Sequence, residues 1–170
     1  MSTVGASVAR RDDIVAFADE LLDLSAFPDY GPMGLQVVGS DEVSFIVCGV
    51  SASRELFERA AALGAQLVLV HHGLFWNRDP RIVDRVLKAR LKALFDADLS
   101  LAAYHLALDA HPEIGNNALL AAQLGVDVEA RFTDVGWVGG SGSRRPRASS
   151  RSGSSRSSGA PPLSSPTAPR

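Results

Sequence analysis

LVLVHHGLFW, residues 67–76, is the segment that best indicates the fold of this 170-residue chain. Its first four residues are all apolar, which is typical of a short strand buried on both faces in a parallel sheet. His71 and His72 follow directly, so we expect them just past the carboxyl end of a strand over residues 67–70. In open α/β sheets, ligands bind in the crevice outside the carboxyl ends of the strands. The two histidines are therefore candidate ligand-binding residues.

Strands and helices are predicted to alternate along the chain. Helices are expected over residues 12–24, 55–63, 81–95 and 117–124, and buried strands over 43–50, 67–70 and 99–104. The clearest helix is 81–95, where apolar residues recur at spacings of three and four. This alternation implies right-handed crossovers between neighbouring strands. The predicted fold class is α/β, with a mostly parallel sheet flanked by helices.

Possible metal ligands follow the predicted strand over residues 99–104, as they follow the predicted strand over 67–70. It is followed by His105 and, four residues later, Asp109. If the two strands are neighbours, His71, His72, His105 and Asp109 converge on one rim of the sheet. Each residue alone fits an ordinary turn, core or cap position, but the joint pattern favours a metal site. Imidazole and carboxylate ligands suit zinc, iron, nickel or manganese.

Adjacent residues of a strand point to opposite faces, so His71 and His72 are not expected to bind one ion from inside a strand. Past the strand end, the two histidines can address two ions about 3.5–4 Å apart, with Asp109 as the bridging carboxylate. His111, which precedes a proline, is expected to be a solvent-facing loop residue. No separate general base is identified, and the catalytic residues stay unassigned.

The charge of the chain is unevenly distributed. The formal net charge is −2, yet residues 141–170 contain six arginines and no acidic residue, so residues 1–140 carry a net charge of −8. We predict one domain over 1–140 and a disordered Ser/Arg/Pro-rich tail over 141–170, because that composition cannot bury enough apolar surface. Nucleic-acid binding by the arginines is not expected, since the tail has no aromatic residue for base stacking. A frameshifted or truncated gene end is the alternative that this composition favours.

The cellular compartment is predicted from three features that the sequence lacks: an intrachain disulfide, a signal peptide and a membrane span. The single cysteine, Cys48, cannot form an intrachain disulfide, which is typical of a reducing compartment. The N-terminus shows no apolar signal-peptide region, and no stretch approaches the roughly 18 apolar residues of a membrane span. We therefore expect a soluble, cytoplasmic protein without a membrane role.

Four blocks of the sequence resemble the Nif-three-like dinuclear-metal family, whose members are often labelled GTP cyclohydrolase I type 2 homologues. The blocks are YGPMGLQV at 30–37, VHHGLFW at 70–76, YHLALDAHP at 104–112 and GNN at 115–117. The resemblance covers roughly residues 10–140. It implies a two-layer α/β protomer, a toroidal homohexamer and two divalent metal ions per chain. It also implies that His71, His72, His105 and Asp109 are metal ligands.

The chain departs from the family pattern at its C-terminal end. The family completes its site with a His-x-x-x-Glu pair on a late helix, whereas this chain has no histidine after His111 and no acidic residue after Asp134. The resemblance therefore predicts weakened metal binding, an unpaired sheet edge and exposed apolar faces. On this interpretation the chain is a C-terminally truncated or frameshifted member.

Three functions are compatible with these residues. The first is a metal-dependent hydrolase, whose substrate the resemblance implies to be a nucleotide-like or heterocyclic small molecule, with GTP as the named candidate. The second is a non-enzymatic metal-binding scaffold or regulatory hexamer, which the lack of an evident general base and of a P-loop favours. The third is a defective product of a longer gene. Whether the chain is an enzyme is left open by the sequence.

Overall fold

A four-stranded sheet forms the centre of the fold. The computed structural model describes residues 7–141, and the predicted tail lies outside this range except for Ser141. The strand order is β2 (Gly34–Val37), β6 (Ser100–Ala103), β5 (Leu67–His72) and β4 (Ile46–Ser51). Strands β4, β5 and β6 are parallel, and β2 runs antiparallel to β6. The predicted α/β class with a mostly parallel sheet is confirmed.

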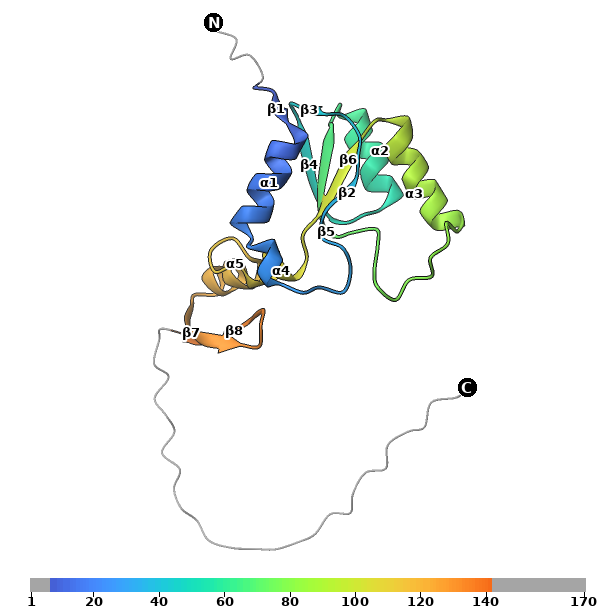
Figure 1. Ribbon diagram of the computed structural model, residues 1–170. Helices are drawn as coiled ribbons and strands as arrows, with labels where there is room; N and C mark the ends of the chain where they lie inside the picture. The colour runs from blue at the N-terminus through green and yellow to red at the C-terminus, as the bar shows by residue number, and fades with distance from the viewer. Residues whose placement is uncertain (1–6, 142–170) are drawn as a thin grey trace, which may run out of the picture.

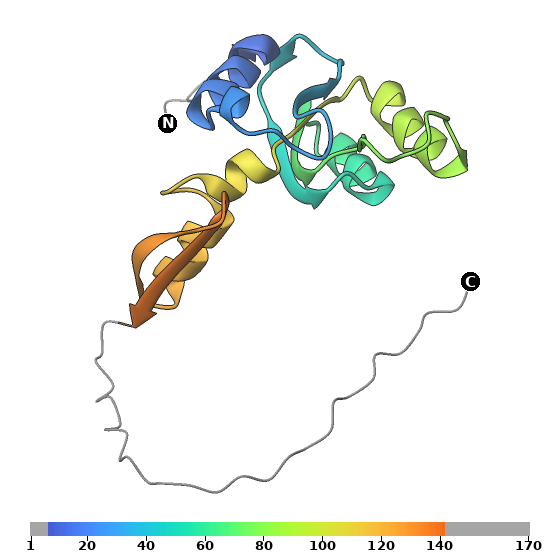
Figure 2. The same ribbon diagram turned by 60° about the horizontal axis from the view of Figure 1, so that its bottom comes forward.

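Helices cover the two faces of this sheet. Figure 1 shows α2 (Arg54–Ala62) and α3 (Arg85–Asp96) on one side, and α1 (Arg11–Leu21) on the other. Two short helices follow β6, namely α4 (Leu106–Ala110) and α5 (Asn116–Gln123). A hairpin of β7 (Val126–Phe132) and β8 (Gly136–Ser141) lies along α5, and Figure 2 shows this unit extending away from the sheet.

Three smaller elements complete the described chain. A 3-10 turn, η1 (Leu24–Ala26), follows α1, and β1 (Ala9–Arg10) pairs with β3 (Glu42–Val43). No helix within residues 7–141 is long and apolar enough to cross a bilayer.

Two predicted helices are shorter than expected because the chain caps or bends at their ends. The helix expected over 12–24 ends at Leu21, and Asp23 has a left-handed backbone with φ +47°. The helix expected over 81–95 begins at Arg85, because the side chain of Asp84 accepts a hydrogen bond from the backbone N–H of Leu87 at 2.7 Å. Ile82, predicted to belong to the apolar stripe of that helix, is 64% exposed.

The core has one layer on each side of the sheet. Between the sheet and α2 and α3, Phe57 packs with Val68 and Leu94. Between the sheet and α1, Leu67 packs with Tyr104. Successive residues of β5 therefore contribute to opposite layers, as the period of a strand requires. This confirms that β5 is a buried central strand.

The prediction of one buried strand over 43–50 is wrong. The segment forms two strands, β3 and β4, and β4 lies at the edge of the sheet with β5 as its partner. Cys48 is exposed, and Val50 is 67% exposed. An apolar run predicts a strand, but it does not specify whether a second strand or a helix covers that strand.

Gly64 ends α2 with a left-handed backbone of φ +75°, and no atom lies within 4 Å of the position that a Cβ would take. We expect Gly64→Ala to lower the free energy of unfolding by about 1–2 kcal/mol, because only backbone strain changes. Gly64→Asn should lower it less, since asparagine tolerates this conformation. Urea unfolding of the three proteins measures the difference. An alanine variant as stable as the wild-type chain would contradict this account of the turn.

Candidate metal centre

Both histidines of the 67–76 segment belong to β5. The strand continues to His72, which pairs with Ser51 of β4, and the backbone carbonyl of His72 accepts a hydrogen bond from Ala52 N–H at 2.8 Å. The prediction that the strand ends at Val70 is therefore wrong by two residues, because β4 supplies a partner for the longer strand. The imidazole rings of His71 and His72 nevertheless lie close together, with centroids 4.6 Å apart.

His105 joins the two histidines from the neighbouring strand. It follows β6 directly, and the parallel pairing of β5 with β6 brings the carboxyl ends of both strands to one edge. One ligand atom from each of His71, His72 and His105 can be chosen so that the three lie within 4.8 Å of one another. All three side chains are half-buried. This histidine triad could hold a metal ion.

The hydrogen bonds around the triad fit that role. The Nδ1 atom of His71 lies 3.0 Å from the carbonyl oxygen of Tyr104, and that of His105 lies 2.9 Å from Oδ1 of Asp29. The Nδ1 atom of His72 is 3.3 Å from Oγ of Ser51. Metal-binding histidines commonly use one ring nitrogen for such a partner and the other for the ion. Nε2 of each ring therefore remains as the donor atom.

Asp109 lies beside the triad, on α4. Its Oδ2 is 3.5 Å from Nε2 of His71, and its Oδ1 accepts a hydrogen bond from the side-chain amide of Asn116 at 2.7 Å. The structure thus brings all four predicted ligands together, although the ligand atoms that all lie within 4.8 Å of one another come from the three histidines. His111 lies outside this group, and its Nδ1 accepts hydrogen bonds from the backbone N–H groups of two following residues.

Burial and neighbouring charges lower the pKa of His72. Desolvation is the main cause, and the nearby imidazoles of His71 and His105 act in the same direction, whereas Asp109 opposes them. A lowered pKa favours the neutral imidazole, which is the form that binds metal.

Asp29 is the residue of this centre that the sequence analysis missed. Burial tends to raise the pKa of its carboxyl, but hydrogen bonds from His105, Leu106 and Tyr30 outweigh burial and place it below the ordinary value. Asp29 lies 76 residues from His105 in the sequence, so no spacing rule connects the two. The sequence offered only a weak signal, namely that Asp29 directly precedes the 30–37 block.

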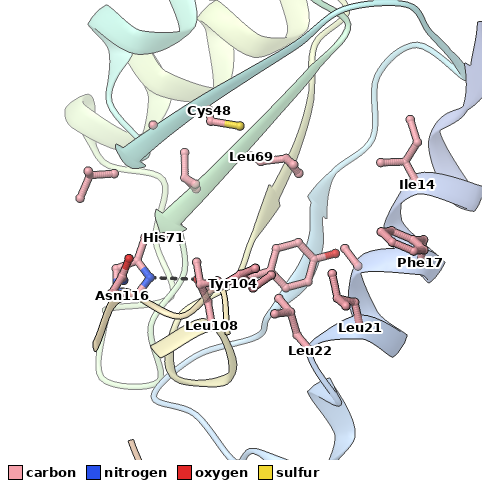
Figure 3. A pocket seen from close by; sticks show the side chains of 15 residues that line it. Ile14, Phe17, Leu21, Leu22, Cys48, Leu69, His71, Tyr104, Leu108 and Asn116 are labelled. Atoms are coloured by element: carbon pink, nitrogen blue, oxygen red, sulfur yellow. Dashed lines mark hydrogen bonds between the residues drawn. The ribbon is translucent and has the colours of Figure 1, made fainter. Parts of the chain in front are cut away.

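An open apolar groove of about 490 Å³ adjoins the triad. It lies between α1 and one face of β4 and β5, and Figure 3 shows Phe17 and Leu21 on one side and His71 beside Asn116 at one end. The dashed line in the same view marks the hydrogen bond of His71 with the Tyr104 carbonyl. His71, one of the predicted ligands, therefore borders a surface that is mostly apolar.

Two aromatic side chains lie beside His105. The ring centroid of Trp76 lies 5.2 Å from that of His105 in an edge-to-face arrangement, and Tyr30 lies 6.3 Å from the same ring. The side chain of His105 between them is 15% exposed.

Comparisons with known proteins identify a matching family and several relatives. Residues 9–141 match the family model described as Duf34/NIF3 (NGG1p interacting factor 3). A Pseudomonas aeruginosa protein named GTP cyclohydrolase 1 type 2 homolog is 50% identical over 116 residues, which cover 68% of this chain and 46% of that protein. The Escherichia coli K12 protein of the same name is 45% identical over 119 residues, which cover 70% and 48%.

Solved structures show the same fold. The protein ybgI, described as of unknown function, is 44% identical with a TM-score of 0.71, over 72% of this chain and 50% of that one. TTHA1606 from Thermus thermophilus is 38% identical with a TM-score of 0.71, over 76% and 53%. This chain therefore spans about half the length of the relatives that it matches. From the family match and these identities, we conclude that the chain belongs to the Duf34/NIF3 family.

Proposed function

We propose that this chain binds divalent metal ions through His71, His72 and His105, with Asp109 as a further ligand. The observation that carries the proposal is the convergence of three imidazole donor atoms within 4.8 Å at the edge of a parallel sheet. Nitrogen donors of this kind suit zinc, iron, nickel or manganese. Asp109, whose Oδ2 lies 3.5 Å from Nε2 of His71, would be the carboxylate ligand if a second ion binds.

The activity that we propose is metal-dependent hydrolysis of a nucleotide-like or heterocyclic compound, with GTP as the first candidate. The name shared by the relatives supports this substrate class. When bound, a divalent ion supplies the Lewis-acid chemistry that activates water for hydrolysis. The residues of the chain would hold the ion: the three imidazoles would bind it, and the Tyr104 carbonyl and Asp29 would orient two of the rings.

Turnover is tested with purified protein, GTP and one of zinc, iron, nickel or manganese at a time, followed by chromatography of the nucleotide. We expect metal-dependent loss of GTP that His72→Ala abolishes. No loss of GTP with any of the four metals would refute this activity, while metal binding itself would still be measured separately.

A metal-binding scaffold is the second candidate. The two carboxylates that touch the histidines, Asp29 and Asp109, are both engaged by other groups, so neither is free to act as a general base. Several apolar side chains of the described chain, such as Phe17 and Val50, are exposed, which favours association with further copies. We propose a homo-oligomer of the size implied by the resemblance, a hexamer. Light scattering measures its mass, and binding of metal without turnover would favour the scaffold.

Asp109→Asn is expected to weaken zinc binding by at least about 10–100-fold, because removing even an outer partner of a metal-binding histidine typically costs that much. The amide keeps the size of the side chain but removes the charge beside His71. Asp96→Asn is the matched control, because Asp96 pairs with Lys92 on the surface of α3 and touches no histidine. Calorimetric titration with zinc measures all three proteins. An unchanged affinity in Asp109→Asn would exclude Asp109 as a ligand.

A further inference from the structure

The carboxylate of Asp29 is buried and accepts three hydrogen bonds, two from backbone N–H groups and one from an imidazole ring. Its side chain is 3% exposed. Oδ1 accepts from the backbone N–H of Tyr30 at 2.6 Å and from Nδ1 of His105 at 2.9 Å. Oδ2 accepts from the backbone N–H of Leu106 at 2.8 Å. Because a carboxylate can only accept, the proton of the neutral His105 ring must lie on Nδ1. Nε2 of His105 is thereby left as a free lone pair.

The bond to Leu106 N–H supports α4. The residue before this helix, His105, has φ −105° and ψ −99° and provides no side-chain cap. The first N–H groups of a helix have no partner within the helix, and a side-chain oxygen commonly satisfies one of them. Here Asp29 supplies that oxygen from a distant loop. The helix in question carries Asp109, so the same carboxylate also supports the backbone of a second predicted ligand.

The loop that carries Asp29 is itself held against the segment that follows the paired histidines. The carbonyl oxygen of Tyr30 accepts a hydrogen bond from the backbone N–H of Asn77 at 2.7 Å. A Cβ at Gly31 would collide with the backbone carbonyl of Phe75, so the two segments touch along their backbones. The position of Asp29 is therefore determined by the chain that extends from β5, the strand of His71 and His72.

We propose that Asp29 is a positioning residue of the metal centre: it sets the tautomer and orientation of His105 and, through Leu106, the placement of the helix that carries Asp109. The inference rests on the proposed metal site. The contact of Asp29 with His105 differs from the contacts that His71 and His72 make through their Nδ1 atoms. The partner of His71 is a backbone carbonyl, which no substitution removes, and the contact between Ser51 and His72 is longer, at 3.3 Å, and exposed.

The first test uses the wild-type chain without metal. Nitrogen-15 NMR of the histidine side chains, at a pH where the rings are neutral, reports which nitrogen carries the proton. We expect the proton of His105 on Nδ1. A proton on Nε2 would overturn the proposal, whether or not the chain binds metal. This measurement therefore separates a failure of the Asp29 inference from a failure of the metal-site proposal.

The second test is Asp29→Asn. The amide keeps one acceptor oxygen and replaces the other by a donor, so it cannot accept from both His105 and Leu106. We expect zinc to bind about 10–100-fold more weakly, as for other outer partners of metal-binding histidines, and the Nδ1–H form of His105 to lose population. Ser51→Ala should weaken binding less.

Asp84→Asn is the matched control, because Asp84 caps α3 through the same kind of contact and lies near no histidine. Its zinc affinity should stay within about twofold of the wild-type value, well short of the roughly 10–100-fold loss expected for a true partner. Asp29→Asn with an affinity within that twofold limit would overturn the proposal. So would a weakened affinity with an unchanged His105 tautomer. If Asp29→Asn does not fold, the wild-type NMR measurement decides alone.

Discussion

The double variant His71→Ala, His72→Ala is expected to bind zinc at least about 1,000-fold more weakly than the wild-type chain. Removing a single outer partner typically costs about 10–100-fold, and this variant removes two of the three proposed nitrogen donors themselves. His105 would remain, with Asp109 near it, and such a pair binds weakly. Elemental analysis of the purified proteins gives the metal content per chain, and calorimetric titration gives the affinity.

His111→Ala is the control for this prediction, because it makes the same chemical change at a histidine outside the triad. It should keep the wild-type metal content. A double variant that retains the wild-type content would refute the site. About one ion per chain in the wild type would match the three histidines, whereas about two would favour Asp109 as a bridging ligand.

The candidate site could be predicted from the sequence to the extent that sheet topology determines it. His71, His72 and His105 were placed together because two parallel strands end at one edge, and β5 and β6 are indeed neighbours. The same reasoning could not find Asp29. Its contact with His105 depends on how a proline- and glycine-containing loop folds back across the sheet edge, which periodicity does not encode.

The errors in the predicted fold also arise from contacts that the local sequence pattern does not encode. The run 43–50 is mostly apolar, yet β4 has a partner strand on one side and an exposed face towards the apolar groove. Burial depends on what covers a strand, and the sequence of the strand does not contain that information. Helix α4 was missed because its five residues are too few to show a helical period.

The hairpin of β7 and β8 was also not predicted. Strand β7, VDVEARF, does alternate apolar and polar residues as a half-buried strand would, so this signal was present in the sequence, although the structure leaves the strand mostly exposed. The pairing depends on the turn between Phe132 and Gly136, where Thr133 has a left-handed backbone of φ +68°. The side chain of Asn117 on α5 donates a hydrogen bond to the Val135 carbonyl at 2.8 Å, which ties the hairpin to the helix.

Phe57→Ala is expected to lower the free energy of unfolding by about 3–5 kcal/mol, because it leaves a cavity in the larger core layer. Phe57 is fully buried, at 0% exposure, between α2 and the sheet. The free energy of unfolding of a domain is only about 5–15 kcal/mol in total, so this variant would retain a small part of it. Phe95→Ala is the control, since Phe95 is 63% exposed on α3 and should cost about 0.5 kcal/mol or less. Urea unfolding followed by circular dichroism measures both; equal losses in the two variants would contradict the assigned core.

The same variant connects the core to the metal centre. Phe57 packs against Val68 of β5, three residues before His71 and four before His72, and a strand rises about 3.3 Å per residue, so Phe57→Ala should leave the folded site intact. Zinc that binds the native state alone would then restore stability, by about 2.7 kcal/mol at a free concentration 100 times the dissociation constant. Adding His71→Ala and His72→Ala to Phe57→Ala should abolish this recovery, because the altered chain no longer binds the ion when folded. Equal recovery in both backgrounds would mean that zinc acts elsewhere on the chain.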